Sequence, residues 1–458
     1  MKSQKKILPI ESNRHRHFIR CFLPVLLFSW QLVNSEQRDN RAKNQKSHFK
    51  TERVSLSSPL AVPKSFSEDW PNFLGPRSDG TSAEKNLIQT WPSSGPQILW
   101  SRALGASYSA PVTSRGRLIL FHRLQNQEVI ESVDAFTGEL IWKQSYPSFY
   151  VDEFGYNGGP RSSPTIEGEH VYTFGAEGKL TCLDFGSGEI LWQHWINRDL
   201  EVPTNFFGVG VSPVIDGDRI LLNVGGGQMA GIVAINKKNG VILWKSGEDK
   251  ASYSTPIIRS IHGIKLGIFF TRQGLNVLET QTGKSLYRYS FRSRNHFSVN
   301  AASPVVVDDY IFLSASYRTG SVLFQLSPIG LQVVWKDSQA MRNHWSTSIY
   351  YQGYLYGMDG RHEGGSRFRC IEFLTGKVLW TAKQGLGRAA FILAEGNLIA
   401  LGERGTLALI EATPERYIER SRAQILQYPC WTPPILSHGR LYVRNETRLI
   451  CLDLREGK

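Results

Sequence analysis

One block of the sequence, Gly159 to Trp192, reads as four short β-strands separated by three turns. Residues 170–174 (HVYTF) follow the alternating pattern of a β-strand. Turns are predicted at 167–169, 176–178 and 185–188, and each contains a Gly, which supplies the backbone conformation of a tight turn. A sheet of this size cannot bury both of its faces by itself. The block therefore requires neighbouring sheets.

The block recurs along the chain. Its turn-strand-Trp ending appears as DAFTGELIW (134–142), DFGSGEILW (184–192), NKKNGVILW (236–244) and EFLTGKVLW (372–380), with weaker copies that end at Tyr287 and Trp335. Counted from Trp100, successive aromatic residues of this series lie 42 to 52 residues apart. A period of about 40–50 residues with four strands per repeat is typical of a β-propeller.

Each unit opens with a Ser-Pro-like step, and eight such steps can be counted. They lie at residues 109–111, 163–164, 212–213, 254–256, 303–304, 346–348, 389–390 and 432–434. The last unit stops at Lys458 before its fourth strand, and residues 97–104 (QILWSRAL) can supply that strand. Closure of this kind removes an exposed sheet edge. We predict an all-β, eight-bladed β-propeller of four-stranded antiparallel blades, closed by an N-terminal strand. Seven blades are the alternative, if residues 389–420 are an insertion.

Residues that repeat once per blade are expected to be structural. The aromatic residues at the blade ends should pack between neighbouring blades; they are Trp100, Trp142, Trp192, Trp244, Trp335 and Trp380. Asp134 and Asp184 stand at the head of a turn, where a carboxylate accepts backbone N–H bonds. Cys182, Cys370 and Cys451 share one repeat position, so they should be separate buried thiols.

The chain before the repeats divides into three parts. Residues 1–35 combine a basic leader with an apolar run at 21–33 that is too short to span a bilayer, and they are predicted to be a signal peptide. An uncleaved membrane anchor is the alternative. Residues 36–66 are polar and charged and are predicted to be a disordered linker. Residues 67–94, rich in turn formers, should wrap onto the propeller, which occupies residues 95–458.

The formal net charge of +13 does not indicate a nucleic-acid-binding surface. Most of the basic excess lies in the first 66 residues, which hold thirteen Lys or Arg against four Asp or Glu. The propeller itself is only mildly basic. We therefore expect an exported protein of the periplasm or extracellular space, envelope-associated if the N-terminal segment is not cleaved. We expect no nucleic-acid partner, no stable transmembrane segment once the signal peptide has been removed, and a monomer.

The ESVDAFTGELIW and TCLDFGSGEILW segments resemble the pyrroloquinoline quinone (PQQ) repeat. The resemblance covers nearly all of residues 70–458, and segments such as DWPNFLGP and CWTPPILSHGRLYVRN are most similar to exported bacterial PQQ-binding-like propellers. Some of these are described by similarity as outer-membrane assembly factors or as polyvinyl-alcohol dehydrogenases. The resemblance implies the propeller fold. It does not decide function, because many such propellers bind no quinone.

The sequence departs from the quinone-dependent alcohol dehydrogenases of this family. Those enzymes typically carry a vicinal Cys-Cys pair over the cofactor, and this chain has none; it also lacks a Cys-x-x-Cys-His haem motif and a His-Glu-x-x-His motif. We therefore predict no cofactor and no metal site and assign no catalytic residue. The alternative is a PQQ- and calcium-dependent oxidoreductase.

The segments that do not repeat are the better candidates for a functional site. Loops that follow a fourth strand should line one mouth of the central channel. The candidate ligand-binding residues there are Arg161, Tyr253, Asn300, His344 and Trp431. Arg can bind a carboxylate through two hydrogen bonds, and aromatic rings can stack on a ligand. As a rim charge, Arg161 should be replaceable by Ala with little loss of stability.

These features favour a non-catalytic binding or scaffold protein of the cell envelope, with a protein or a glycan as its partner at the propeller face. An oxidoreductase that uses PQQ is the alternative function.

Overall fold

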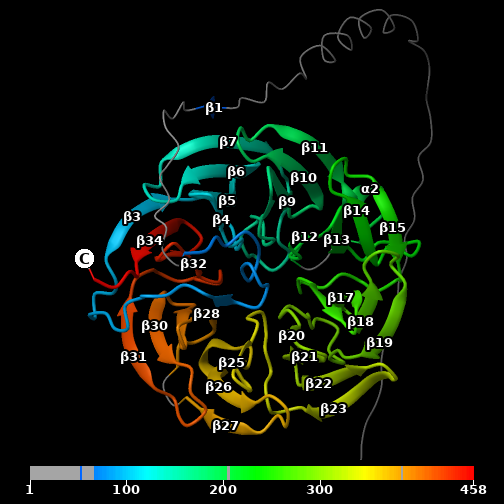
Figure 1. Ribbon diagram of the computed structural model, residues 1–458. Coiled ribbons are helices and arrows are strands. Elements are labelled where there is room, and N and C mark those ends of the chain that lie inside the picture. The colour runs from blue at the N-terminus through cyan, green and yellow to red at the C-terminus, as the bar shows by residue number, and fades with distance from the viewer. Residues whose placement is uncertain (1–51, 54–66, 204–206, 383–384, 458) are drawn as a thin grey trace, which may run out of the picture. The chain divides into compact units, whose positions relative to one another are not determined.

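The computed structural model describes residues 52–53, 67–203, 207–382 and 385–457. Within these ranges the chain forms eight sheets, each built on four antiparallel strands and arranged around a central axis (Figure 1). The described helices are limited to α2 (Ile196–Asp199) and the 3-10 turn η1 (Glu363–Gly365). The predicted all-β, eight-bladed propeller is therefore confirmed. The predicted signal peptide and linker lie outside the described residues, except for strand β1 (Glu52–Arg53), which pairs with β7.

The first four blades, each from its first to its fourth strand, are β4 (Val112–Ser114), β5 (Arg117–Leu124), β6 (Gln127–Asp134) and β7 (Leu140–Pro147); β8 (Thr165–Glu167), β9 (His170–Phe174), β10 (Lys179–Asp184) and β11 (Ile190–Trp195); β12 (Val214–Asp216), β13 (Arg219–Asn223), β14 (Ile232–Asn236) and β15 (Ile242–Ser246); and β16 (Ile257–Ile261), β17 (Ile264–Phe270), β18 (Gly274–Glu279) and β19 (Ser285–Ser290).

The last four blades are β20 (Val305–Val307), β21 (Tyr310–Ala315), β22 (Gly320–Ser327) and β23 (Gly330–Asp337); β24 (Ile349–Tyr351), β25 (Tyr354–Asp359), β26 (Arg367–Glu372) and β27 (Val378–Thr381); β28 (Ala389–Ala394), β29 (Asn397–Gly402), β30 (Thr406–Glu411) and β31 (Glu419–Gln424); and β32 (Ile435–Ser437), β33 (Arg440–Arg444), β34 (Arg448–Asp453) and β3 (Ile98–Ala103).

The order of strands gives the ring two different ends. Consecutive first strands from β4 to β28 contact one another around the axis, and the fourth strands lie on the outside (Figure 1). The turns between first and second strands and between third and fourth strands lie at one end, which we call the turn face. The loops between second and third strands, and the loops that join one blade to the next, lie at the other end, which we call the mouth face.

The ring is closed by the strand that precedes the first blade. Strand β3 pairs antiparallel with β34, with Trp100 opposite Cys451 and Ser101 opposite Ile450. The eighth blade thus takes three strands from the C-terminal end and one from the N-terminal side, as the sequence predicts. The degenerate stretch at 389–420 belongs to a complete seventh blade, β28 to β31, so the seven-bladed alternative is wrong.

The repeated motif holds neighbouring blades together through one Trp and one Gly. The indole N–H of Trp142 donates to the carbonyl oxygen of Phe185 in the next blade, at 3.0 Å. The turn residue Gly188 has φ +74, and a Cβ added there would lie 2.5 Å from the Trp142 ring, so only Gly allows the turn to pack so closely. Equivalent indole bonds are made by Trp100, Trp192, Trp244, Trp335 and Trp380.

On the neighbouring strand, a small residue lies opposite three of these tryptophans and leaves space for the indole ring. Ser132 pairs with Trp142, Cys182 with Trp192, and Ala234 with Trp244. The thiols of Cys182, Cys370, Cys430 and Cys451 are free and buried, in agreement with the prediction for the three repeat cysteines.

Burial of the blade-end tryptophans is less uniform than the repeat suggests. Trp142 is 1% exposed, whereas the other five are half-buried. Trp142 lies on β7, whose outer edge is paired with β1, with Arg53 opposite Trp142. The other five lie on fourth strands that are the outermost of their sheets and have solvent on one side.

Residues 67–94 lie across the turn face and contact blades from opposite parts of the ring. Trp70 pairs with Thr113 of blade 1, and strand β2 (Thr81–Ser82) adds to β28 of blade 7 as a parallel strand. The guanidinium of Arg259 in blade 4 donates to the carbonyl of Arg77. These contacts link blades that do not touch one another.

Candidate functional site at the mouth face

The five predicted site residues come from five inter-blade loops of the mouth face. Each lies shortly before a first strand, in blade 2, 4, 5, 6 or 8; they are Arg161, Tyr253, Asn300, His344 and Trp431. Since the first strands surround the axis, these positions converge on one end of the channel.

A chain of aromatic contacts connects two of them across the mouth. The Trp431 ring lies 5.4 Å from that of Tyr156, which lies 5.7 Å from that of Phe207. Phe207 in turn lies 5.5 Å from the ring of Tyr253, and its backbone N–H donates to the Tyr253 hydroxyl. Tyr108 also packs on Trp431, at 5.3 Å. Such tilted ring pairs stabilise the loops that carry them.

Arg161 joins this aromatic cluster through Tyr108. Its guanidinium lies 5.4 Å from the centre of the Tyr108 ring and 5.5 Å from that of Tyr150. It also forms an ion pair of 2.6 Å with Asp152, whose side chain is fully buried. Arg161 is therefore not the solvated rim charge that the sequence prediction assumed. The structure instead predicts a loss of stability for Arg161→Ala, because the substitution would leave a buried carboxylate without its partner.

Trp431 also belongs to a second cluster, which contains Arg388 and Glu403. The indole N–H of Trp431 donates to Glu403, and the Arg388 guanidinium lies 4.9 Å from the centre of the indole and pairs with the same carboxylate at 2.6 Å. Burial, together with the charges of Arg388 and Arg361, lowers the pKa of His344 to about 3. His344 is thus a neutral side chain at physiological pH.

Asn300 has a different position from the other four. It is 4% exposed, and its side-chain amide donates to the carbonyl oxygens of Thr271 and Phe291, while its own backbone carbonyl accepts from the N–H of Tyr253. These bonds occupy the Asn300 amide and position the loop that presents Tyr253.

The sequence prediction missed several side chains of the mouth face. Tyr317 lies 3.1 Å from Nε2 of His344, and Glu446 accepts hydrogen bonds from Tyr108 and Asn157. Tyr317, Glu403 and Glu446 lie on loops between second and third strands, which share the mouth face with the inter-blade loops. The sequence prediction considered only the inter-blade loops.

The donor set of the mouth does not suit PQQ with its calcium ion. Calcium prefers carboxylate oxygens, and the Asp152 and Glu403 carboxylates are each held by an Arg. In the part of the chain that the structure describes, no three His, Cys, Asp or Glu side chains are grouped so that they could hold a metal ion. The four described cysteines lie in separate places rather than as a pair.

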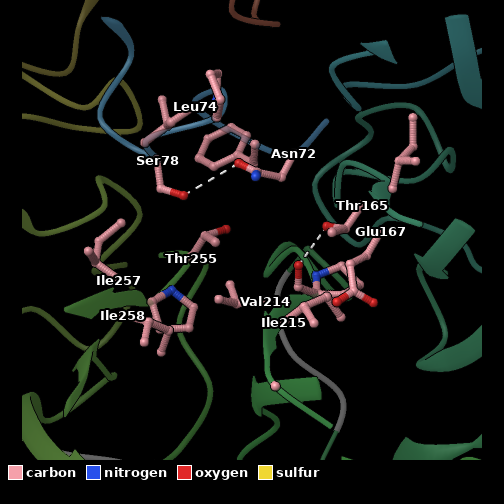
Figure 2. Close-up of a pocket in the computed structure, with 16 residues that line it drawn as sticks. Asn72, Leu74, Ser78, Thr165, Glu167, Val214, Ile215, Thr255, Ile257 and Ile258 are labelled. Atoms are coloured by element: carbon pink, nitrogen blue, oxygen red, sulfur yellow. Dashed lines mark hydrogen bonds between the residues drawn. The ribbon is translucent and has the colours of Figure 1, made fainter. Parts of the chain in front are cut away.

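A cavity lies at the turn face, between the segment 67–94 and the first strands of the blades. Its volume is about 310 Å³, and Figure 2 shows Leu74 and Ser78 of the segment facing Val214 and Thr255 of blades 3 and 4. The Thr165 hydroxyl donates to the Pro213 carbonyl there, so part of its polar lining is already satisfied.

Comparisons with known proteins agree with the fold and identify the family. A PQQ-like repeat propeller is the class that the eight blades and their Trp-Gly contacts define. The sequence model of the PQQ_2 family, described as outer membrane protein assembly factor BamB, matches residues 125–382, and the chain belongs to this family.

Individual relatives are distant. The chain is 21% identical over 362 residues to outer membrane protein assembly factor BamB of Yersinia pestis, covering 72% of this chain and 82% of the relative. Among solved structures it is similar to BamB from Moraxella catarrhalis (TM-score 0.57, 14% identity, 80% of this chain and 99% of the other). It is also similar to quinohemoprotein alcohol dehydrogenase from Comamonas testosteroni (TM-score 0.58, 12% identity, 85% and 81%). At these identities the two structures support the fold alone. No helix among the described residues is long and apolar enough to cross a membrane.

Proposed function

We propose that this protein is an exported, non-catalytic propeller that binds a protein partner in the cell envelope through its mouth face. The family match supports the class, since its relatives are described as assembly factors of the outer membrane. The observation that carries the proposal is the loop between blades 1 and 2. It exposes four large apolar side chains within residues 149–156: Phe149, Val151, Phe154 and Tyr156.

These exposures are large for apolar side chains. Phe149 is 68% exposed and Val151 is 79% exposed. A contiguous set of exposed apolar groups on one loop is typical of a protein–protein contact. The same loop holds an ion pair between Arg161, near its end, and Asp152, which lies within the apolar stretch. The ion pair ties this stretch to the end of the loop, while Phe149 and Val151 stay exposed to a partner.

The side chains at the mouth support binding rather than catalysis. His344, with a pKa near 3, is too weakly basic to take a proton from a substrate at neutral pH. The carboxylates of Asp152 and Glu403 are neutralised by arginines. The quinone-dependent alternative is tested separately: purified protein incubated with PQQ and Ca²⁺ should retain no chromophore after dialysis, and a retained one would favour an oxidoreductase.

The test of partner binding uses the full chain and two surface variants. Val151→Asp introduces a charge at the apolar loop, and Ile329→Asp introduces the same charge at an 86% exposed position in a turn-face hairpin. Tagged protein is cross-linked in intact envelopes, and the captured proteins are quantified by mass spectrometry.

The Ile329→Asp variant should recover the same partner as the parent protein, and Val151→Asp should lose it. Equal recovery with both variants would exclude the loop as the contact. If the only binder that depends on the loop were a carbohydrate, the glycan alternative would replace the protein partner. Fractionation of the same cells checks export, and light scattering of the purified protein checks the expected monomer.

A further inference from the structure

A second and larger cavity opens on the mouth face between blades 4, 5 and 6. Its volume is about 890 Å³. Its lining comes from residues 290–295 at the end of β19, residues 316–319 between β21 and β22, and residues 360–362 and 365 between β25 and β26, together with Lys336 and Arg342. This volume lies within the range of small-molecule sites in proteins.

The lining is strongly and uniformly basic. Six cationic side chains take part: Arg292, Arg294, Arg318, Lys336, Arg342 and Arg361. No Asp or Glu is among the lining residues that the structure describes. The propeller as a whole is only mildly basic, so this concentration is a local feature of three blades. A cavity lined by one sign of charge attracts ligands of the opposite sign.

Only one of the six cations is neutralised by the protein. Arg342 forms two hydrogen bonds with the carboxylate of Asp359, at 2.7 and 2.6 Å. Among the described residues the other five have no ion-pair partner. Two of them are positioned by aromatic rings instead: Arg361 lies 4.6 Å from the centre of Tyr317, and Lys336 lies 5.5 Å from that of Tyr289. A cation on an aromatic face keeps its charge available to a ligand.

The backbone of the central turn is strained, in a conformation that Gln228 and Met229 also adopt in the corresponding loop of blade 3. Tyr317 and Arg318 have φ of 60 and 64, and the N–H of Thr319 donates to the carbonyl of Ser316, which defines a hairpin turn with two left-handed residues. In five turns of the turn face, the second left-handed residue is a Gly: Arg115-Gly116, His262-Gly263, Gln352-Gly353, Glu395-Gly396 and His438-Gly439. Two bulky residues in this conformation cost stability, and such costs tend to occur at binding sites.

We propose that this cavity binds a compact ligand that carries two or more phosphate groups. Guanidinium groups bind phosphate oxygens in pairs of hydrogen bonds. The five unneutralised cations carry more positive charge than a ligand with a single carboxylate would neutralise. The hydroxyl groups of Ser293 and Ser316 also lie in the lining, where they donate to the backbone carbonyls of Tyr317 and Arg342 and hold the loops that carry the cations. The site is separate from the apolar loop of blades 1 and 2, so it does not depend on the proposed protein partner.

The proposal is tested by calorimetry with pyrophosphate as the probe. The parent protein should bind pyrophosphate more tightly than inorganic phosphate or citrate at equal ionic strength, and the affinity should fall as salt is raised. The Arg292→Ser/Arg318→Gly double variant removes two cations and should weaken binding by at least about tenfold. The control is Lys238→Ser/Lys284→Ser, which removes two exposed cations from the turn face.

An independent readout comes from stability. Arg318→Gly removes the backbone strain at this position, because Gly adopts the left-handed conformation without strain. The substitution should therefore raise the melting temperature while it weakens pyrophosphate binding. Equal loss of binding in the two double variants would show that only net charge matters and would overturn the site. Citrate binding as tight as that of pyrophosphate would overturn the assignment to phosphate.

A further arm of the experiment separates the two sources of such a ligand. Vesicles that contain cardiolipin, whose headgroup carries two phosphate groups, are compared with vesicles of phosphatidylglycerol, which carries one. Displacement of pyrophosphate by cardiolipin alone would assign the site to a lipid headgroup. Binding of pyrophosphate without displacement by either lipid would assign it to a soluble phosphorylated compound.

Discussion

The two faces of the ring are built on different principles. On the turn face, one contact is repeated from blade to blade: a Trp donates to a carbonyl of the next blade, and the Gly of that turn packs on its ring. On the mouth face, a backbone N–H to hydroxyl contact recurs before several first strands, as from Ser163 to Ser212, but the loops beyond it differ from blade to blade. There, Arg161 pairs with Asp152, Arg388 pairs with Glu403, and Trp431 packs among tyrosines. The comparison indicates that the repeated face carries the stability of the fold, whereas the irregular face carries its individual binding chemistry.

Removal of the closing strand should have the largest effect of any change to the repeated architecture. A chain without residues 1–104 lacks β3, which leaves β34 as an open edge at the eighth blade. We expect this protein to aggregate or to lose cooperative unfolding, as monitored by circular dichroism and gel filtration. A chain without residues 1–66 loses the two-residue edge strand β1 but keeps both β3 and the segment across the turn face, so it should stay soluble and unfold cooperatively. Equal melting of the two truncated chains would contradict closure by β3.

Trp142 provides a test within the repeated contacts. It is the most buried of the blade-end tryptophans, so Trp142→Ala should lower the free energy of unfolding by about 3–5 kcal/mol. Trp244→Ala, at the equivalent but half-buried position, should cost clearly less. Urea unfolding of both variants measures the difference. A smaller loss for Trp142 than for Trp244 would show that burial does not rank these contacts.

On the irregular face, Arg161 should matter for stability more than its place near the mouth suggests. Arg161→Ala leaves the fully buried Asp152 without its ion-pair partner and should cost about 3 kcal/mol. Asp152→Asn combined with Arg161→Ala removes the charge but keeps an oxygen that can accept from the N–H groups of Phe154 and Tyr156. The double variant should therefore unfold at a higher urea concentration than Arg161→Ala. If the double variant is less stable, the buried charge is not the cause of the loss.

The same contrast explains how much the sequence could predict. The residue types at Trp142, Gly188 and Cys182 recur about once per blade. Because one repeated pattern describes all the blades, a single sequence is enough to predict their number and the closing strand. Arg161, Tyr253, His344 and Trp431 could be assigned to one face because their place before a first strand is also part of the repeat.

The contacts of the mouth residues could not be predicted, because they depend on loops of individual length and conformation. Nothing in the repeat places Glu446 beside Tyr108, or Asp152 beneath Arg161. Asn300 shows the limit most clearly: it occupies the predicted position, yet its amide is used by backbone carbonyl groups of the preceding blade. A residue's place in the repeat predicts the face on which it lies, but not the partner that its side chain finds.

Glu128 offers the smallest and most specific test, because it is an acidic side chain buried between blades on the irregular face. Its carboxylate accepts the backbone N–H of Ala176 in the neighbouring blade, and burial raises its pKa to about 6. A folded-state pKa above the ordinary value of about 4.5 means that the folded protein binds the proton more tightly than the unfolded chain does. The wild-type protein should therefore lose stability as the pH rises from about 4.5 to about 6, by roughly 2 kcal/mol in total.

Glu128→Gln keeps an acceptor for Ala176 and removes the charge, so its stability should not show this loss. Relative to the parent, the variant should be about equally stable near pH 4 and more stable at pH 7, as measured by urea unfolding at both values. Glu139→Gln, at an exposed turn of the turn face, is the matched control and should change stability little at either pH. A stability difference between Glu128→Gln and the parent that stays constant from pH 4 to pH 7 would show that the Glu128 carboxyl does not titrate in this range. The buried charge of Glu128 would then not lower the free energy of unfolding at neutral pH.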